Sequence, residues 1–189
     1  MKTLGIIAEY NPFHNGHLYQ IQKAKELTNA DCVVIVMSGD FVQRGTPAWT
    51  DKYLRTKMAL LNQADLVFEM PVVYASSSAE TFALAGVSLL NSLGFADMLC
   101  FGSECGDAAA LERVAQCLDS ELYHAGLRRF LNEGMSFAAC RQAVVRGILG
   151  PADAALLSGA NNNLGAEYLK AVRQLGSSGG GNHFVEFGE

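Results

Sequence analysis

The sequence lacks the basic runs, long apolar stretches and paired cysteines that are typical of nucleic-acid-binding, membrane and secreted proteins. Charged residues make up only 17% of its 189 residues, the net charge is −5, and no basic run occurs, so the charge gives no support for non-specific nucleic-acid binding. No apolar stretch reaches the roughly 18 residues of a membrane span, and no leader precedes the first expected strand. The five cysteines are scattered without a Cys-x-x-Cys pair, which is typical of a reducing cytosol. We therefore expect a cytoplasmic protein without a membrane segment.

Apolar runs and helical patterns alternate over the first hundred residues. Continuous apolar runs predict buried strands at 4–8 and 32–37, and two further strands are expected at 65–70 and 97–101. Helical spacing predicts helices between them, at 15–27, from an N-cap at Asp51 to about 62, and at 76–93. This alternation predicts an α/β fold with a Rossmann-like parallel sheet and flanking helices.

The pattern after residue 106 is helical throughout. We expect helices at 108–118, 121–132, 137–147 and 164–175, with a short loop at Gly150-Pro151. The chain then divides into an α/β domain at 1–105, a helical segment at 106–175 that completes the site, and a linker-like, atypical tail at 176–189.

In open parallel sheets, the loops that follow the strands meet at one edge, where ligands bind. The turn at 14–17, the loop at 38–45, the segment after Met70 and the turn at 102–104 fall on that edge in this interpretation.

The stretch His14-Asn15-Gly16-His17 lies between an expected strand and an expected helix. A glycine lets backbone approach a phosphate, a helix N-terminus attracts anions, and imidazoles donate hydrogen bonds to phosphate oxygens. Two alternatives remain open. The histidines could bind zinc, although no third ligand is evident, or they could simply cap the helix.

Other loop residues are candidates for substrate or metal binding. Asp40 is suited to Mg²⁺, Arg44 to a bidentate grip on phosphate or carboxylate, and Ser38 to a substrate; the alternative is a solvated loop with an Asp–Arg pair. Lys52, near Arg55 and Lys57, could face an anion or belong to a solvated helix face. Gly102 could lie against an adenine or ribose, or form a tight turn.

Taken together, several long motifs resemble the bacterial tRNA(Met) cytidine acetate ligases. The resemblance runs from residue 1 to about 176 and is carried by Glu9-Tyr10-Asn11-Pro12-Phe13-His14-Asn15-Gly16-His17, Met37-Ser38-Gly39-Asp40-Phe41-Val42-Gln43-Arg44-Gly45, Glu69-Met70-Pro71-Val72-Val73-Tyr74-Ala75, Phe101-Gly102-Ser103-Glu104 and Asn161-Asn162-Asn163-Leu164-Gly165-Ala166-Glu167-Tyr168-Leu169-Lys170.

This resemblance implies a nucleotidyltransferase-like HUP domain that uses ATP and Mg²⁺. It implies activation of acetate as acetyl-adenylate and transfer of the acetyl group to N4 of the wobble cytidine of elongator tRNA(Met). His14, His17 and Asp40 would be catalytic. The implied ATP-binding residues are Ile7, Ala8, Glu9, Tyr10, Asn11, Pro12, Phe13, His14, Asn15, Gly16, His17, Leu18, Tyr19, Gln20, Gly102 and Asn162. The resemblance predicts no protein-only metal site, with Mg²⁺ arriving with ATP and Asp40 as a candidate ligand.

The chain departs from the family pattern at its end. The family continues with a Thr-Ile-x-Arg-like element of the ATP site, whereas no arginine follows Arg173 here. We therefore expect the activity of this shortened chain to be impaired. Two alternatives stay open, a small-molecule nucleotidylyltransferase and a nucleotide-binding module without turnover. The sequence leaves the oligomeric state open.

Overall fold

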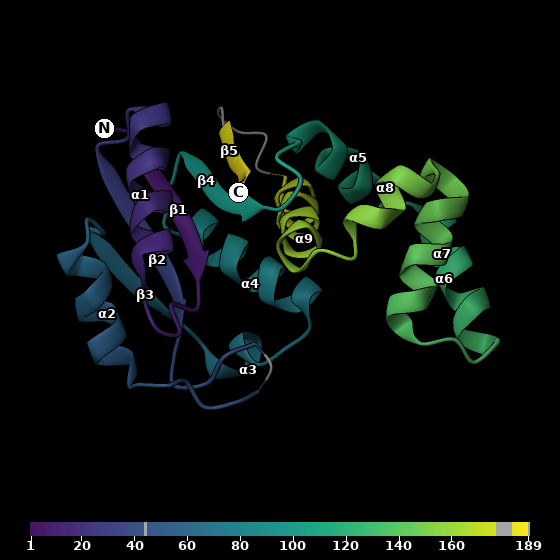
Figure 1. Ribbon diagram of the computed structural model, residues 1–189, viewed down its shortest axis with the longest axis horizontal. Coiled ribbons are helices and arrows are strands. Elements are labelled where there is room, and N and C mark those ends of the chain that lie inside the picture. Colours follow the sequence, from purple (N-terminus) through teal and green to yellow (C-terminus); the bar gives the residue numbers. More distant parts are fainter. Residues whose placement is uncertain (44, 177–182, 189) are drawn as a thin grey trace. The chain divides into compact units, whose positions relative to one another are not determined.

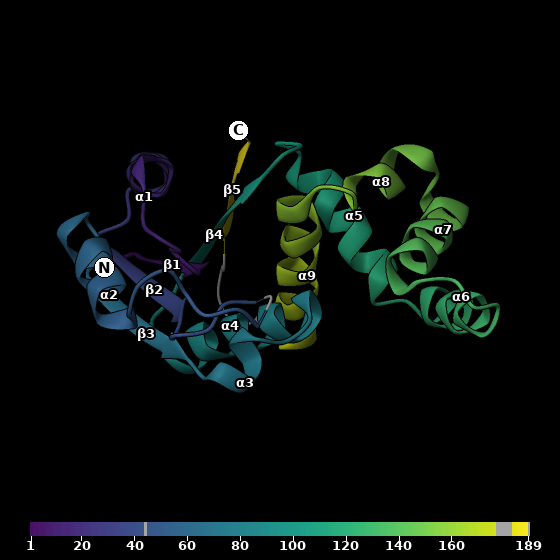
Figure 2. The same cartoon turned by 60° about the horizontal axis from the view of Figure 1, so that its bottom comes forward.

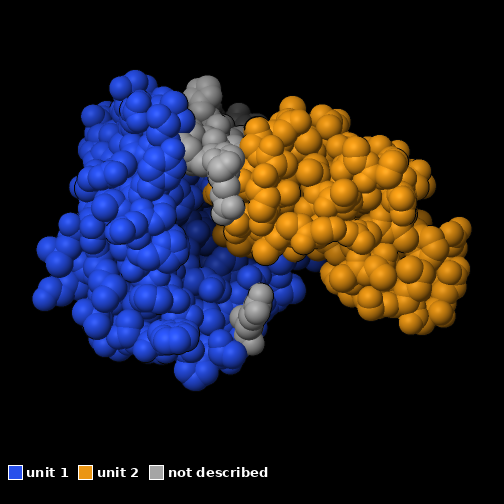
Figure 3. All heavy atoms as spheres, viewed as in Figure 1, with its two compact units in different colours: residues 1–101, 171–187 blue, residues 102–170, 188–189 orange. Residues whose placement is uncertain are grey.

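The computed structural model describes residues 1–43, 45–176 and 183–188, which form two compact units (Figure 3). Residues 1–101 and 171–187 make up the first unit, and residues 102–170 with 188–189 make up the second. The domain boundary expected at residue 105 stays a prediction. Within the described parts of the chain, no helix combines the length and the apolar character needed to cross a membrane.

A five-stranded sheet has the order β3-β2-β1-β4-β5 (Figure 1). Its strands are β1 (Thr3–Ala8), β2 (Cys32–Ser38), β3 (Leu66–Met70), β4 (Met98–Ser103) and β5 (His183–Gly188). β1 pairs in parallel with β2 and β4, and β2 pairs in parallel with β3. The expected parallel α/β sheet is therefore confirmed.

The tail contributes an element that the sequence does not predict. β5 lies at the edge of the sheet beside β4, where the pattern indicated only a linker-like tail. Strand pairing between segments that are distant in sequence cannot be predicted from the six residues of β5 alone, because local sequence does not specify the partner strand. The glycine-rich residues 177–182 lie outside the described residues.

An aspartate stands directly before each of β2, β3 and β4 and sets where the strand begins. The carboxylates of Asp31, Asp65 and Asp97 accept hydrogen bonds, each 2.7 Å long, from the backbone N–H groups of Lys2, Val33 and Thr3 on the neighbouring strand or just before it. Strands β3 and β4 consequently start one residue later than expected, because Asp65 and Asp97 cap their strands.

The alternation along β1 sends side chains to two helical layers. Toward one face, Leu4 and Ile6 pack in a cluster with residues of α1 (Asn15–Thr28) and α2 (Lys52–Leu61). On the other face, α4 (Ala79–Ser92) lies so close that a Cβ at Gly5 would meet Leu90 at 2.7 Å. α1 and α4 accordingly lie on opposite sides of the sheet in Figure 2. The short helix α3 (Val72–Ala75) after Pro71 was not expected, and α4 begins three residues later than predicted.

The second unit is built from helices around its own apolar cluster. They are α5 (Ala108–Leu118), α6 (Glu121–Asn132), α7 (Phe137–Leu149), α8 (Pro151–Leu156) and most of α9 (Ala160–Gln174). α8 stands where a loop was expected, because Pro151 occupies the first position of a helix, a place that proline favours. α9 starts four residues earlier than expected.

Candidate functional site

The chain leaves β1 through a tight turn that ends at α1. Tyr10 has a φ of 44°, a left-handed conformation that costs a non-glycine residue roughly 1–2 kcal/mol. Burial of its ring offsets this cost, because Tyr10 is only 1% exposed. The Asn11–Pro12 peptide bond is cis. Burial also raises the pKa of the Tyr10 phenol well above its ordinary value, so Tyr10 is a neutral packing residue.

The two histidines of this turn lie against each other. The rings of His14 and His17 are stacked, with centroids 3.7 Å apart and 22° between their planes. Tyr10 and Phe13 pack on the ring of His17 at centroid distances of 4.7 and 5.5 Å. The aromatic contacts and the stacked partner thus fix the orientation of the half-buried His17 ring.

Backbone hydrogen bonds determine which nitrogen of each ring accepts. His14 is the N-cap of α1, and its Nδ1 accepts from the Gly16 N–H at 3.1 Å. His17 Nδ1 accepts in turn from the His14 N–H at 3.2 Å. With Nδ1 acting as acceptor, the proton of a neutral imidazole resides on Nε2. Both rings therefore offer Nε2–H as a hydrogen-bond donor.

His17 remains neutral well below its usual titration range. Burial, with a smaller contribution from the adjacent His14, lowers its pKa from the ordinary value of 6.5 to about 4. His17 is consequently a neutral donor at physiological pH, with its tautomer set by the backbone.

This pKa predicts a pH dependence of stability. Between pH 6.5 and about 4 the unfolded chain binds a proton at His17 that the folded chain does not, so the free energy of unfolding should fall as the pH is lowered through this window. Urea unfolding of wild type and His17→Asn at pH 7, 5.5 and 4.5 measures this effect. The stability difference between the two chains should shift against wild type as the pH falls, and a constant difference would contradict the lowered pKa.

Helix capping and zinc binding were the two alternative roles for His14 and His17. Capping is realised, since both histidines bond backbone N–H groups at the start of α1. It does not compete with ligand binding, because capping uses Nδ1 and leaves Nε2–H. No group of three His, Cys, Asp or Glu side chains arranged to hold a metal occurs among the described residues, so the zinc hypothesis finds no support. Gly16 also has a role that was not expected, because a Cβ there would lie 3.0 Å from the His14 ring.

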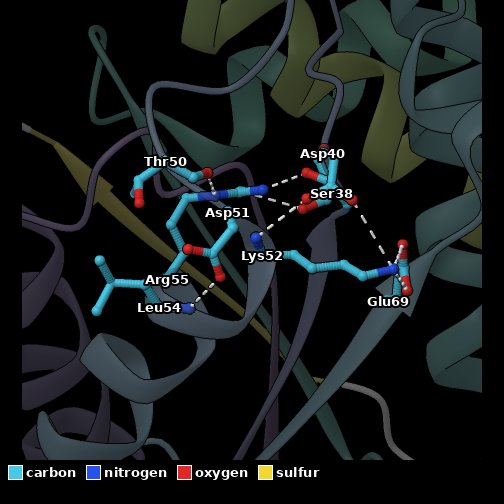
Figure 4. A network of polar contacts seen from close by, with 9 residues as sticks. Ser38, Asp40, Thr50, Asp51, Lys52, Leu54, Arg55 and Glu69 are labelled. Atoms are coloured by element: carbon cyan, nitrogen blue, oxygen red, sulfur yellow. Dashed lines mark hydrogen bonds and ion pairs between the residues drawn. The ribbon is translucent and has the colours of Figure 1, made fainter.

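Arg55 holds the strand ends beside this turn together. It is fully buried, and its guanidinium donates to the carbonyl oxygens of Ser38 (3.1 Å) and Thr50 (3.1 Å), both labelled in Figure 4. It also donates to the carbonyl oxygens of Glu9 (2.6 Å) and Gly39. Burial lowers its pKa, yet arginine stays charged in proteins. The side chain joins the ends of β1 and β2 to the loop before α2, and the sequence interpretation missed this role.

Lys52 is engaged by acidic side chains. Its Nζ lies 2.8 Å from both carboxylate oxygens of Glu69 and 4.0 Å from Asp40, whose other oxygen accepts from the Lys52 N–H at 3.1 Å (Figure 4). The hydrogen bond to Glu69 raises the pKa of Lys52. An ammonium thus lies beside both carboxylates, and magnesium binding by Asp40 stays a prediction.

The loop after β2 is tied to the histidine turn. The Gln43 N–H donates to Glu9 Oε1 at 2.7 Å, and the Trp49 N–H donates to Asn11 Oδ1 at 2.7 Å. Ser38 is fully buried, and its carbonyl, not its hydroxyl, contacts Arg55. Arg44 lies outside the described residues.

The remaining predicted residues occupy both units. In the first unit, Ile7 and Ala8 belong to β1, Leu18, Tyr19 and Gln20 follow the histidines in α1, and Gln20 reaches Cys100 Sγ at 3.9 Å. In the second unit, Gly102 lies in β4, and Asn162 lies in the first turn of α9 with its Oδ1 bonded to the backbone after β4. Glu104, whose carboxylate accepts hydrogen bonds from the backbone at the start of α9, belongs to one of the family-like motifs but had no predicted role.

Comparisons with known proteins identify the family of this chain. A family model described as HIGH Nucleotidyl Transferase matches residues 1–179. The chain is 48% identical to a tRNA(Met) cytidine acetate ligase of Acetivibrio thermocellus and 49% identical to one of Thermoanaerobacter sp. strain X514, covering 94% of this chain and 44% and 45% of those proteins. Its structure matches that of Thermotoga maritima TmcAL bound with alpha-thio ATP with a TM-score of 0.91 and 37% identity, over all of this chain and 46% of that one.

The chain thus spans about half the length of the curated relatives it matches. The family model, in contrast, covers nearly the whole of it, including the histidine turn. The chain belongs to the HIGH nucleotidyl transferase family.

Proposed function

We propose that this chain binds ATP and supplies the adenylyl-transfer centre of a tRNA(Met) cytidine acetate ligase. The observation that carries the proposal is the stacked pair His14 and His17, whose Nδ1 atoms are fixed by backbone N–H groups and whose Nε2–H groups are thereby left as donors. Such a pair at a helix N-terminus suits a triphosphate. The solved relative was crystallised with an ATP analogue, and the curated relatives are named for the tRNA reaction.

The proposed chemistry needs charge stabilisation and alignment more than a covalent nucleophile. An acetate oxygen attacks the α-phosphorus of ATP. The bond between this phosphorus and the oxygen that bridges the α- and β-phosphates breaks, and pyrophosphate leaves. The two Nε2–H groups would donate to phosphate oxygens as charge shifts toward the leaving group. The amine N4 of the cytidine then attacks the acetyl carbon, AMP departs, and the nitrogen loses a proton. A tRNA substrate would place the protein in the cytoplasm.

Magnesium enters this proposal only with the nucleotide. Mg²⁺ is commonly held by substrate phosphates and one or two carboxylates, and its charge would offset that of the triphosphate. Asp40, the candidate ligand, lies 4.0 Å from the Lys52 ammonium, which also pairs with Glu69. We assign no protein ligand to the ion and no step to it.

The test is exchange of labelled pyrophosphate into ATP. The purified chain should catalyse this exchange only when acetate is present, because acetyl-adenylate must form before pyrophosphate can re-enter. Exchange without acetate, dependent instead on a phosphorylated cofactor precursor, would indicate a small-molecule nucleotidylyltransferase. ATP binding in calorimetry without any exchange would show a binding module and contradict the proposal. Acetylation of the cytidine in tRNA(Met) is the second measurement.

A further inference from the structure

Glu104 and Asn162 bind each other's backbone in the second unit. Asn162 Oδ1 accepts from the N–H groups of Glu104 (2.9 Å) and Cys105 (3.1 Å). The carboxylate of Glu104 accepts in return from the N–H groups of Asn161 (2.9 Å) and Asn162 (2.7 Å). These four hydrogen bonds, here called the Glu104–Asn162 clamp, join the loop after β4 to the start of α9 across 57 or 58 residues of sequence.

The clamp determines which polar groups remain for a ligand. The first N–H groups of α9, which would otherwise attract an anion, already serve the Glu104 carboxylate. The oxygen of the Asn162 amide is used twice by backbone, so its Nδ2 hydrogens are what it can offer to another molecule. The start of α9 is therefore a structural joint and not a phosphate site.

Gly159 leaves the space that the clamp occupies. A Cβ at this position would lie 2.6 Å from Glu104 Oε2 and 3.0 Å from Asn162 Nδ2. Both atoms are held by the clamp, so a methyl group here would push the carboxylate away from the two N–H groups that it accepts. The close fit leaves no room for a side chain at position 159 while the clamp is formed.

Gly102 precedes Glu104 by two residues at the end of β4. Around the position of a Cβ on Gly102, no heavy atom of the described chain beyond its neighbours lies within 4 Å. The segment between them is further ordered by the Gly106 N–H, which donates to Ser103 Oγ at 3.0 Å. The clamp therefore fixes the backbone immediately after an open, side-chain-free position against which a flat ring can lie.

We propose that Glu104 is a positioning residue for nucleotide binding, acting through the clamp on the backbone at Gly102 and on the Asn162 amide. This inference rests on the proposed function, since it concerns the affinity for the ATP that the chain is proposed to bind. Glu104 itself does not touch the nucleotide, because both of its oxygens face the N–H groups of α9.

The test compares ATP affinity in wild type and Glu104→Gln by calorimetry, with the KM for ATP and kcat from acetate-dependent pyrophosphate exchange. The glutamine keeps the size of the side chain but turns one acceptor into a donor facing an N–H group. We expect the Kd and the KM for ATP to rise about tenfold, with kcat within about twofold of wild type. Glu121→Gln, also at a helix N-terminus of this unit but outside the clamp, should bind ATP like wild type.

A second variant, tested beside its own control, disturbs the clamp without altering the polar groups that form it. Gly159→Ala should weaken ATP binding as Glu104→Gln does. Gly147→Ala should not, because no described atom apart from its chain neighbours and the nearby backbone of its own helix would lie within 4 Å of the added methyl group. A Glu104→Gln chain that melts earlier but binds ATP as tightly as wild type while folded has a merely structural glutamate, and this result overturns the positioning role alone. Wild type that binds no ATP overturns the proposed function and this inference together.

Discussion

Replacing His17 by asparagine should slow acetate-dependent pyrophosphate exchange by about two to three orders of magnitude while leaving the fold intact. The asparagine side chain can place an oxygen where Nδ1 accepts from the His14 N–H, so the cap of α1 is retained. It has no counterpart to Nε2–H, and loss of one preorganised donor to developing charge typically costs about 10²- to 10³-fold in rate. Steady-state exchange and circular dichroism measure the two effects.

The reciprocal substitution separates capping from catalysis. His17→Gln extends an amide N–H toward the position of Nε2 but loses the acceptor near His14. We expect it to keep part of the exchange activity and to destabilise the start of α1 by about 1 kcal/mol. His124→Ala, at an exposed histidine of the second unit, is the control and should match wild type. Equal exchange rates for wild type and His17→Asn would refute a phosphate role for the imidazole.

The main features of the sheet and of the histidine turn follow from local sequence patterns. The continuous apolar runs of β1 and β2 define strands buried on both faces, and a helical period beginning at Asn15 places the two histidines between β1 and α1. The stacking of the rings and the lowered pKa of His17 do not follow from the sequence. They depend on contacts of the folded chain, among them the Tyr10 ring, which packs on the His17 imidazole at a centroid distance of 4.7 Å.

The features that sequence reasoning missed are joined by long-range contacts. The start of α9 was expected at Leu164, because its actual cap is the carboxylate of Glu104, more than fifty residues earlier. Likewise, the spacing of Lys52, Arg55 and Lys57 suggested a solvated helix face or an anion site. Local sequence cannot show that the ends of two strands present carbonyl oxygens to one of these cations, whereas the exposed Lys57 follows the simple expectation.

Removing the guanidinium of Arg55 should therefore produce the largest loss of stability of any change considered. Arg55→Met keeps much of the apolar volume but leaves the carbonyl oxygens of Glu9, Ser38, Gly39 and Thr50 without their donor. Each buried unpaired polar group costs about 1–3 kcal/mol, and loss of a buried charged partner typically costs about 3–5 kcal/mol. In a chain of this size we expect the Tm to fall by roughly 10 °C or more.

Urea unfolding and thermal melting of three chains test this expectation. Lys57→Met changes an exposed cation two residues further along α2 and should stay within about 0.5 kcal/mol of wild type. Arg55→Lys keeps a positive charge but lacks the planar set of five donors, so its stability should fall between those of wild type and Arg55→Met. Because Arg55 binds the backbone at Glu9, directly before the histidine turn, Arg55→Lys should also weaken ATP binding at temperatures where it remains folded. A methionine variant as stable as Lys57→Met would show that the strand ends hold together without this side chain.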